Sequence, residues 1–170
     1  KGRNIRVFHS STGFNIIFSD TPEAVLLSSY DPYRREVRKL TREKLIGDGR
    51  IHPALIEEVY NKSKAELDKQ IQEVGEETVF NLGLHAIHPE IIKLIGRLKY
   101  RTSYGQNVLG HSTAVAKICG MMAAEPVMDA KMAKRAGLLP DIGKAIVYDH
   151  EGSHTTTGVE LAKSYTADAK

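Results

Sequence analysis

The feature that most constrains this chain is a run of helical periodicity over residues 53–82. His52-Pro53 opens the run, and proline suits the first helical position because the N–H that it lacks would have no partner there. Seven acidic residues and three lysines cover the polar side. The apolar side chains recur about every 3.5 residues, at Ile56, Val59, Tyr60, Leu67, Ile71 and Val74. We therefore expect one long connecting or packing helix here rather than a site.

Similar signals predict the other helices. Asp31-Pro32 opens a helix that ends near Asp48, and His88-Pro89 opens another. Apolar spacing predicts further helices over about 106–124, 129–139 and 155–164. The stripe expected in the helix 106–124 is Val108, His111, Val115, Ile118 and Met122. In the helix after Pro32, the basic side chains expected at the surface, away from its apolar stripe, are Arg34, Arg35, Arg38, Lys39 and Arg42.

Strand signals occur in the first 50 residues. A short helix over 3–11 is expected before two segments rich in β-branched and apolar residues, 14–18 and 23–28, which turn residues separate. These segments predict a hairpin. The composition changes near residue 50, so the predicted fold class is α+β: short strands and helices first, then a mostly α-helical region.

Composition and charge limit the class of protein. The chain has 170 residues and is 41% hydrophobic, which allows one or two small domains. It contains no run of 18 apolar residues and no signal-peptide pattern, so we expect no membrane contact. Cys119 is the one cysteine, which fits a buried thiol in a reducing cytosol. Residues 1–50 hold ten Lys and Arg against six Asp and Glu, which suits either a phosphate-binding face or an ordinary solvated surface.

His111 and Asp141 are the residues best suited to chemistry. A histidine on an apolar helix face is most often a core residue with one hydrogen bond, but Asp141 follows an apolar helix where a buried carboxylate needs a partner or a metal. Imidazole and carboxylate groups on neighbouring helices would suit Zn, Mn, Fe or Mg. Such a metal could activate a bound water molecule to attack a phosphoryl group. The alternative is that Asp141 caps the following turn.

Three further features lie near this pair in the sequence. Lys144, one turn after Asp141, is either a phosphate contact or a solvated lysine. His154 is either another ligand or a surface loop residue. A basic loop that leads into the His111 helix suits a polynucleotide backbone and stacked bases, although most such stretches are only loops: Lys99, Tyr100, Arg101, Tyr104, Gln106 and Asn107.

Several stretches are similar to the bacterial ribonuclease Y family, membrane-anchored endoribonucleases with a KH domain followed by an HD domain. The stretch over residues 94–109, Leu-Ile-Gly-Arg-Leu-Lys-Tyr-Arg-Thr-Ser-Tyr-Gly-Gln-Asn-Val-Leu, is the most specific. The others are residues 20–25, 31–37, 49–53 and 133–139. The resemblance extends along nearly the whole chain.

The resemblance implies a domain order and RNA contacts. Residues 1–50 would be a partial KH domain, 51–82 a connecting helix, and 83–170 the N-terminal part of an HD domain. Gly2 looks like the last glycine of a Gly-x-x-Gly loop that clamps a nucleic-acid backbone. The residues then expected to contact RNA are Gly2, Arg3, Arg6, Lys99 and Arg101.

The resemblance also implies a catalytic site with a divalent metal (Mg, Mn or Zn). The metal ligands would be His111, Asp141 and His154, and the catalytic residues Asp141 and Lys144. Pro140 stands where the family has the His of its His-Asp pair, and a proline can neither ligate a metal nor donate a backbone N–H. We therefore expect a weakened or inactive endoribonuclease of the kind that acts in mRNA decay. The alternatives are a non-catalytic RNA-binding or dimerisation fragment and a small-nucleotide phosphohydrolase.

Partners and location follow from the same resemblance. The expected partners are RNA, a second copy of the chain and other RNA-degradation proteins. Against the family pattern the chain looks truncated at both ends, without the membrane helix, the coiled coil and the later ligands. Full-length members would lie at the inner face of the bacterial cell membrane, and this fragment would be cytoplasmic and soluble.

Overall fold

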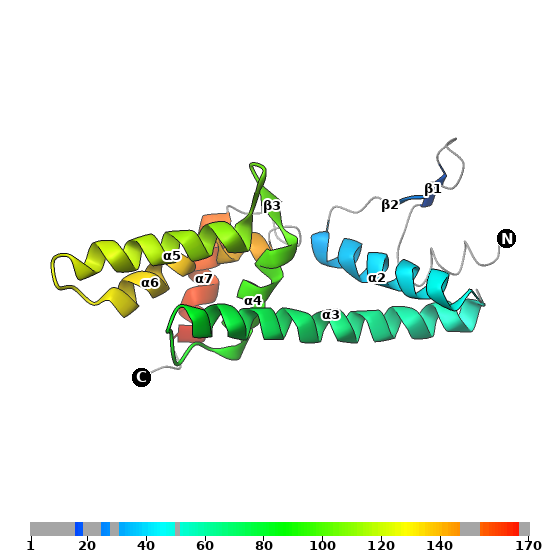
Figure 1. The fold of residues 1–170 in the computed structure, drawn as a ribbon, viewed down its shortest axis with the longest axis horizontal. Coiled ribbons are helices and arrows are strands. Elements are labelled where there is room, and N and C mark those ends of the chain that lie inside the picture. Colours follow the sequence, from blue (N-terminus) through cyan, green and yellow to red (C-terminus); the bar gives the residue numbers. More distant parts are fainter. Residues whose placement is uncertain (1–15, 19–24, 28–30, 50–51, 147–153, 167–170) are drawn as a thin grey trace. The chain divides into compact units, whose positions relative to one another are not determined.

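The computed structural model describes residues 16–18, 25–27, 31–49, 52–146 and 154–166 (Figure 1). The chain divides into two compact units, residues 1–69 and 70–170, which are described separately. The predicted helix over 3–11 and the predicted RNA contacts Gly2, Arg3 and Arg6 lie outside the described residues.

The first unit contains a strand pair and helix α2. Strands β1 (Ile16–Phe18) and β2 (Val25–Leu27) pair antiparallel, with Ile16 opposite Leu27, so both predicted strands are confirmed. Helix α2 (Pro32–Asp48) begins and ends where the sequence predicted. The Asp31 carboxylate accepts a hydrogen bond from the Tyr33 amide at 2.9 Å, and Gly49 ends the helix with φ of 71°.

Helix α3 (Pro53–Asn81) is the long helix predicted after His52. Within the first unit, the Tyr33 hydroxyl donates to the Asp68 carboxylate at 2.8 Å and so ties α2 to α3. The prediction that Arg38 lies at the surface is wrong, because it is buried beside Val37. This burial lowers the pKa of Arg38, since desolvation disfavours its charged form.

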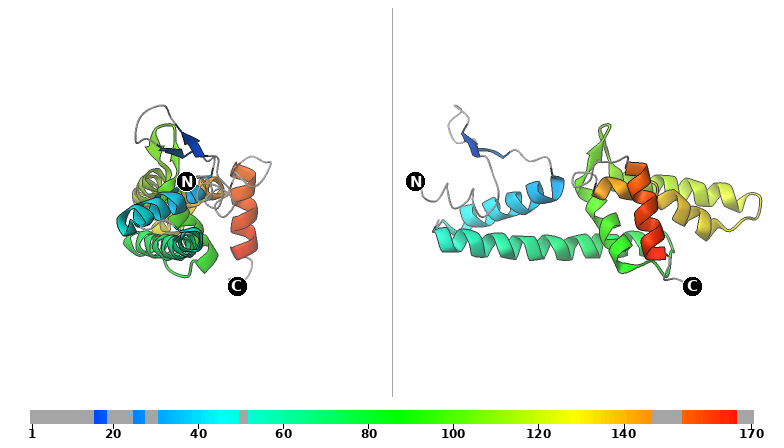
Figure 2. Two further views of the ribbon diagram at one scale, coloured as in Figure 1. Left: turned by 90° about the vertical axis from the view of Figure 1, so that its right-hand side faces the viewer. Right: turned by 180° about the vertical axis from the view of Figure 1, so that it is seen from behind.

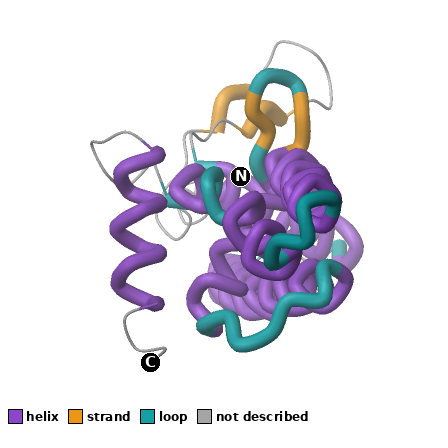
Figure 3. Tube along the Cα trace, turned by 90° about the vertical axis from the view of Figure 1, so that its left-hand side faces the viewer, coloured by secondary structure: helices purple, strands orange, loops and turns teal. Residues whose placement is uncertain are grey.

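Most of the described chain is helical, as the purple segments of Figure 3 show, and the second unit consists mainly of short helices. Its elements after α3 are α4 (Pro89–Arg97), the 3-10 helix η1 (Leu98–Tyr100), β3 (Thr102–Ser103), β4 (Gln106–Asn107), α5 (Val108–Ala124), α6 (Ala130–Leu138), the 3-10 helix η2 (Ile142–Ala145) and α7 (His154–Thr166). Helices α5 and α6 lie side by side, and α7 packs on η2 and α4 (Figure 2). The core of this unit is Val79, Leu82, Leu84, Ile91, Leu94, Ile95, Ala116, Leu138 and Ile142.

A tight hairpin precedes α5, where the sequence predicted a loop and a helix that starts at residue 106. Strands β3 and β4 pair antiparallel, with Thr102 opposite Asn107. Helix α5 therefore begins at Val108, and the Asn107 side chain caps it by accepting from the Gly110 amide at 3.1 Å. The hairpin was missed because each strand has only two residues, too few for an alternating pattern.

The buried face of α5 differs from the predicted stripe. Val108 is buried as expected, but His111, Ile118 and Met122 are exposed. The buried side of the helix consists mostly of small residues: Ser112, Ala116, Gly120 and Ala123. Helix α6 approaches this side so closely that a Cβ at Gly137 would lie 3.0 Å from the Ala116 Cα. A stripe drawn from large apolar residues alone could not reveal a contact made of small ones.

Within the described residues, none of the helices combines the length and apolar character needed to cross a bilayer.

Candidate active site on α5 and the α6–η2 loop

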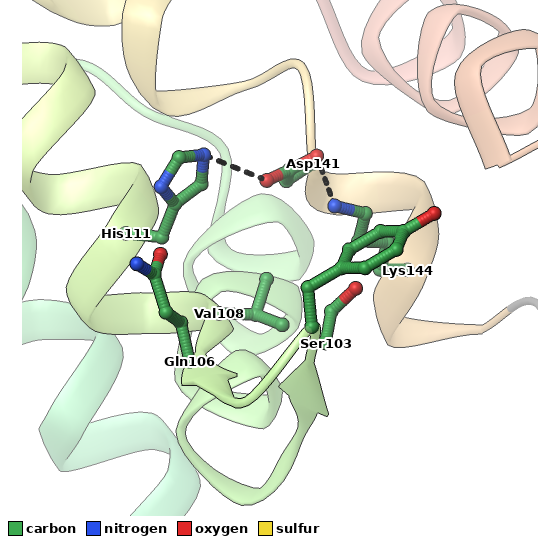
Figure 4. A pocket seen from close by; sticks show the side chains of 7 residues that line it. Ser103, Gln106, Val108, His111, Asp141 and Lys144 are labelled. Carbon is green, nitrogen blue, oxygen red and sulfur yellow. Dashed lines mark ion pairs between the residues drawn. The ribbon is translucent and has the colours of Figure 1, made fainter.

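His111 and Asp141, thirty positions apart in the sequence, lie together in the second unit (Figure 4). His111 comes from the first turns of α5, where the Asn107 cap fixes the helix start. Its Nε2 is 3.8 Å from an Asp141 carboxylate oxygen, Oδ2. The imidazole side chain is 49% exposed, so this histidine is a surface group at a pocket and not a core residue.

Asp141 lies just after α6 and immediately before η2. Its carboxylate makes no capping hydrogen bond to η2, so the turn-capping alternative is wrong. Its second oxygen, Oδ1, is instead 2.8 Å from the Lys144 Nζ. The Asp141 and Lys144 side chains are only 16% and 17% exposed, so Lys144 is not the solvated lysine of the alternative interpretation. A partly desolvated carboxylate thus has an imidazole on one side and an ammonium on the other.

Two hydrogen bonds to backbone carbonyls connect η2 to Arg101 and Arg101 to the start of α5. The Arg101 guanidinium donates to the Lys144 carbonyl, and the Val108 amide donates to the Arg101 carbonyl at 3.0 Å. Arg101, predicted to contact RNA, is therefore joined to the segment that carries Lys144. Lys99 is exposed, with its ammonium 5.9 Å from the centre of the Tyr100 ring.

A small pocket of about 100 Å³ lies over these groups. The β3–β4 hairpin forms one wall (Figure 4). His111 comes from α5, Asp141 from the segment between α6 and η2, and Lys144 from η2. The lining residues are Ser103, Tyr104, Gln106, Val108, His111, Asp141 and Lys144. The sequence had singled out each of these residues individually except Ser103, which it marked only as part of the stretch 94–109.

The donors in this pocket fit a divalent cation in type and separation. Ligands such as an imidazole nitrogen and a carboxylate oxygen each lie about 2.0–2.2 Å from zinc, so two of them 3.8 Å apart can share one ion. Their number is too small, because the described part of the chain holds no group of three or more His, Cys, Asp or Glu placed for a metal. His111 and Asp141 are therefore a partial donor set.

The predicted third ligand, His154, is the first residue of α7, and its side chain lies outside the described part. Helix α7 does approach the loop at Gly158. A Cβ at that position would lie 3.3 Å from the Gly143 amide nitrogen and 3.6 Å from the carbonyl oxygen of Pro140. Pro140 itself is an exposed residue. The structure thus brings α7 close to the Asp141 loop.

A second pocket of about 270 Å³ lies near the start of α6. Leu84, His85, Asp129, Lys131, Met132 and Arg135 line it. Arg135 donates to the His85 carbonyl at 2.5 Å. Nothing in the sequence marked these residues as a group, since they come from two distant segments without a shared motif.

One family model matches a segment of the second unit. Residues 108–169 match the family model described as the HD domain, and this segment contains His111, Asp141 and Lys144. No solved structure matches the chain.

Three similar proteins carry the name Ribonuclease Y. The chain is 58% identical over all 170 residues to Ribonuclease Y of Syntrophotalea carbinolica, of which it covers 33%. It is 58% identical over 165 residues to Ribonuclease Y of Oleidesulfovibrio alaskensis, with 97% of the chain and 32% of the relative covered. It is 59% identical over 165 residues to Ribonuclease Y of Bacillus thuringiensis, with 97% of the chain and 32% of the relative covered. The chain thus spans about a third of the length of these relatives.

Proposed function

We propose that this chain is part of an endoribonuclease of the ribonuclease Y type, a metal-dependent hydrolase of RNA phosphodiesters that acts in mRNA decay. The observation that carries the proposal is the meeting of His111 and Asp141, at 3.8 Å, inside the segment that matches the HD domain. The identity of 58% to relatives named Ribonuclease Y supports RNA as the substrate.

In this proposal the residues have separate roles. His111 and Asp141 would hold one divalent cation (Mg, Mn or Zn), and His154 would add a third ligand. When bound, the cation would supply an acidified water and a polarised phosphoryl oxygen. Lys144 would meet the phosphate, because its ammonium lines the same pocket and lies 2.8 Å from Asp141. The Arg101 guanidinium would keep Lys144 in place by donating a hydrogen bond to the Lys144 carbonyl.

Pro140 would reduce the activity of this site. It precedes Asp141 directly, at the position that we assign to the histidine of the His-Asp pair, and it offers no metal ligand. Calorimetry with Mn or Zn tests the site. We expect weak binding that His111→Ala and Asp141→Ala both abolish, and tighter binding in Pro140→His. Binding that survives both alanine variants would place the metal elsewhere.

RNA cleavage separates this proposal from its alternatives. Labelled RNA is incubated with the chain, Pro140→His and the double variant Pro140→His with Asp141→Asn, with Mn or with chelator. Metal-dependent cleavage that Pro140→His increases and the double variant loses supports the hydrolase. RNA binding without cleavage in any variant supports a non-catalytic RNA-binding or dimerisation fragment. Hydrolysis of free nucleotides in place of RNA supports a small-nucleotide phosphohydrolase.

Further RNA contacts are proposed outside the pocket. Residues 1–50 would form a partial KH domain that holds RNA through Gly2, Arg3 and Arg6, with 51–82 as connecting helix and 83–170 as the N-terminal part of the HD domain. In the second unit, exposed Lys99 would add a cation near the pocket.

We also propose that two copies of the chain associate and that other RNA-degradation proteins are partners. Support for the homodimer comes from large apolar side chains exposed on α5, α6 and the turn between them: Ile118, Met121, Met122, Val127, Met128 and Met132. The full-length protein would lie at the inner face of the bacterial membrane, and this part of it would be cytoplasmic and soluble.

A further inference from the structure

Tyr104 occupies an unfavourable place for a large side chain. It forms the β3–β4 turn with Gly105, and the two residues have φ of 50° and 75°. A two-residue turn with both φ values positive is of type I′, which strongly prefers Asn-Gly. A bulky residue in this left-handed region is strained, because its Cβ crowds the backbone.

Packing within the second unit does not compensate for this strain. Tyr104 is 103% exposed as a residue, so its ring buries no apolar surface. The other tyrosine of the segment, Tyr100, is half-buried, and its hydroxyl lies 3.5 Å from the Gln70 side-chain oxygen. Tyr100 therefore has a structural role, whereas folding offers no reason for an aromatic ring at position 104.

Tyr104 is also part of the pocket wall. It lines the same pocket as His111, Asp141 and Lys144, and that pocket has room for little more than a phosphate group. A base attached to a phosphate bound there would have to lie outside, where the exposed ring of Tyr104 is the aromatic surface among the lining residues. Stacking of a base on an aromatic ring tolerates any sequence, since every base has a π-face.

We propose that Tyr104 is a substrate-positioning residue whose ring stacks on an unpaired base next to the phosphate held at Lys144. The proposal rests on the proposed function and deepens it by naming the residue that would meet the base next to the bound phosphate. In a duplex both faces of each base are already stacked, so the ring would have no free face to meet. Selection of unpaired RNA at this pocket would then be a property of the hairpin.

The test uses two variants that differ in the ring and in the turn. Tyr104→Phe keeps the ring. Tyr104→Asn removes the ring but gives the turn its preferred Asn-Gly sequence, so this variant should fold at least as well as the parent chain, with a thermal midpoint higher by about 2–4 °C. Phe80→Ala is the control, because Phe80 is also exposed in the second unit but does not line the pocket.

Binding is measured by fluorescence anisotropy with chelator present to prevent cleavage. The probes are a labelled oligoadenylate, the same backbone with abasic sites, and an RNA duplex. We expect Tyr104→Asn to bind oligoadenylate on the order of 10-fold more weakly, with no change for the abasic strand or the duplex. Tyr104→Phe and Phe80→Ala should bind as the parent chain does.

Lys144→Ala distinguishes failure of this inference from failure of the proposed function. One outcome separates the two proposals: the parent chain binds oligoadenylate, Lys144→Ala weakens this binding, and Tyr104→Asn leaves it unchanged. In that case the stacking role of Tyr104 is overturned and the RNA site stands. An equal loss for oligoadenylate and abasic strand in Tyr104→Asn also overturns stacking. If the parent chain binds none of the probes, the stacking role of Tyr104 falls, and the metal-dependent cleavage assay decides on the proposed function separately.

Discussion

At the scale of single residues, the candidate site depends on one carboxylate with two partners. Asp141 faces His111 with one oxygen and Lys144 with the other, and the two charged side chains are largely withdrawn from water. Removing one member of such a pair leaves the other charge poorly solvated, which costs more than the loss of an exposed ion pair.

A double-mutant cycle measures this dependence. We expect Asp141→Asn and Lys144→Met each to lower the free energy of unfolding by about 1–2 kcal/mol, because each removes the ion-pair partner of a partly buried group. The double variant should lose about 1 kcal/mol less than the sum of the two. Urea unfolding followed by circular dichroism gives all four values. Additive losses would mean that the two residues are not coupled.

The exposed pair of Glu58 and Lys62 on α3 is the matched control for this cycle. Its atoms are as close, at 2.7 Å, and the hydrogen bond from Lys62 lowers the pKa of Glu58. Solvent screens this pair, so its coupling should be clearly smaller than that of Asp141 and Lys144. A larger coupling at Glu58 would contradict the argument from burial.

At this scale the sequence singled out residues that the structure brings together, but it did not show their surroundings. His111, Asp141 and Lys144 were selected by chemistry and spacing, and the structure brings them to one pocket. The sequence could not show that Lys144 pairs with Asp141, because this contact depends on how η2 turns after Pro140. Arg38 was placed at the surface for a similar reason, since composition cannot identify a charged residue that packing covers.

At the scale of elements, helix starts were predictable because their signals are local. Asp31-Pro32, His52-Pro53 and His88-Pro89 precede α2, α3 and α4 as predicted. The contact between α5 and α6 was not predictable, because it depends on small residues that carry no periodic apolar signal. At Gly137 the two helices come so close that an added Cβ would lie 3.0 Å from the Ala116 Cα.

Gly137→Ala tests this close contact. Alanine favours a helix more than glycine does, so propensity alone predicts stabilisation. The added Cβ would meet the Ala116 Cα and the Cys119 Sγ at 3.0 Å, and we expect a net loss of about 1–3 kcal/mol in the free energy of unfolding. Gly110→Ala is the control, since its nearest neighbour would lie 3.9 Å away, and it should be neutral or stabilising. Stabilisation by both substitutions in thermal unfolding would refute the close contact.

Like the β3–β4 turn with Tyr104, the turn after α5 contains a residue with a strained backbone. Val127 has φ of 60°, and its amide and that of Met128 bond to the carbonyls of Ala124 and Ala123, the pattern of a helix end that usually carries glycine. Val127→Gly should therefore raise the free energy of unfolding by about 0.5–1 kcal/mol, because it removes the strain and the exposed side chain packs little. Chemical denaturation measures the change.

Ala114→Gly, at an exposed position inside α5, is the control for Val127→Gly and should lower the same quantity by about 1 kcal/mol. Two glycine substitutions with opposite signs would show that backbone conformation, and not glycine itself, decides the effect. A loss of stability in Val127→Gly would argue against the left-handed conformation at this turn.

At the scale of the whole molecule, the chain has two compact units and one helix that belongs to both. The units meet at residues 69 and 70, inside α3, whereas the composition changes near residue 50. The proposed boundary at residue 50 stays a prediction. Composition reports the local balance of residue types, while compact units depend on contacts between distant segments, so the two need not coincide.

The apolar surface of the α5–α6 pair provides the last prediction. Because the small residues of α5 face α6, its large ones, Ile118, Met121 and Met122, face away from that contact. Exposed apolar surface of this kind favours association. We expect sedimentation velocity to show a concentration-dependent dimer that Met122→Lys weakens, because an ammonium in the interface would lose its hydration.

Phe80→Lys is the control for charge, since Phe80 is equally apolar and exposed but lies on α3. It should leave the dimer intact. A parent chain that stays monomeric at every concentration would contradict the homodimer, and a dimer weakened equally by both variants would place the interface elsewhere. If only Met122→Lys loses the dimer, dimer formation depends on the exposed methionines of α5. These methionines are exposed because the small residues of α5 form the contact with α6, so that contact would be linked to dimer formation.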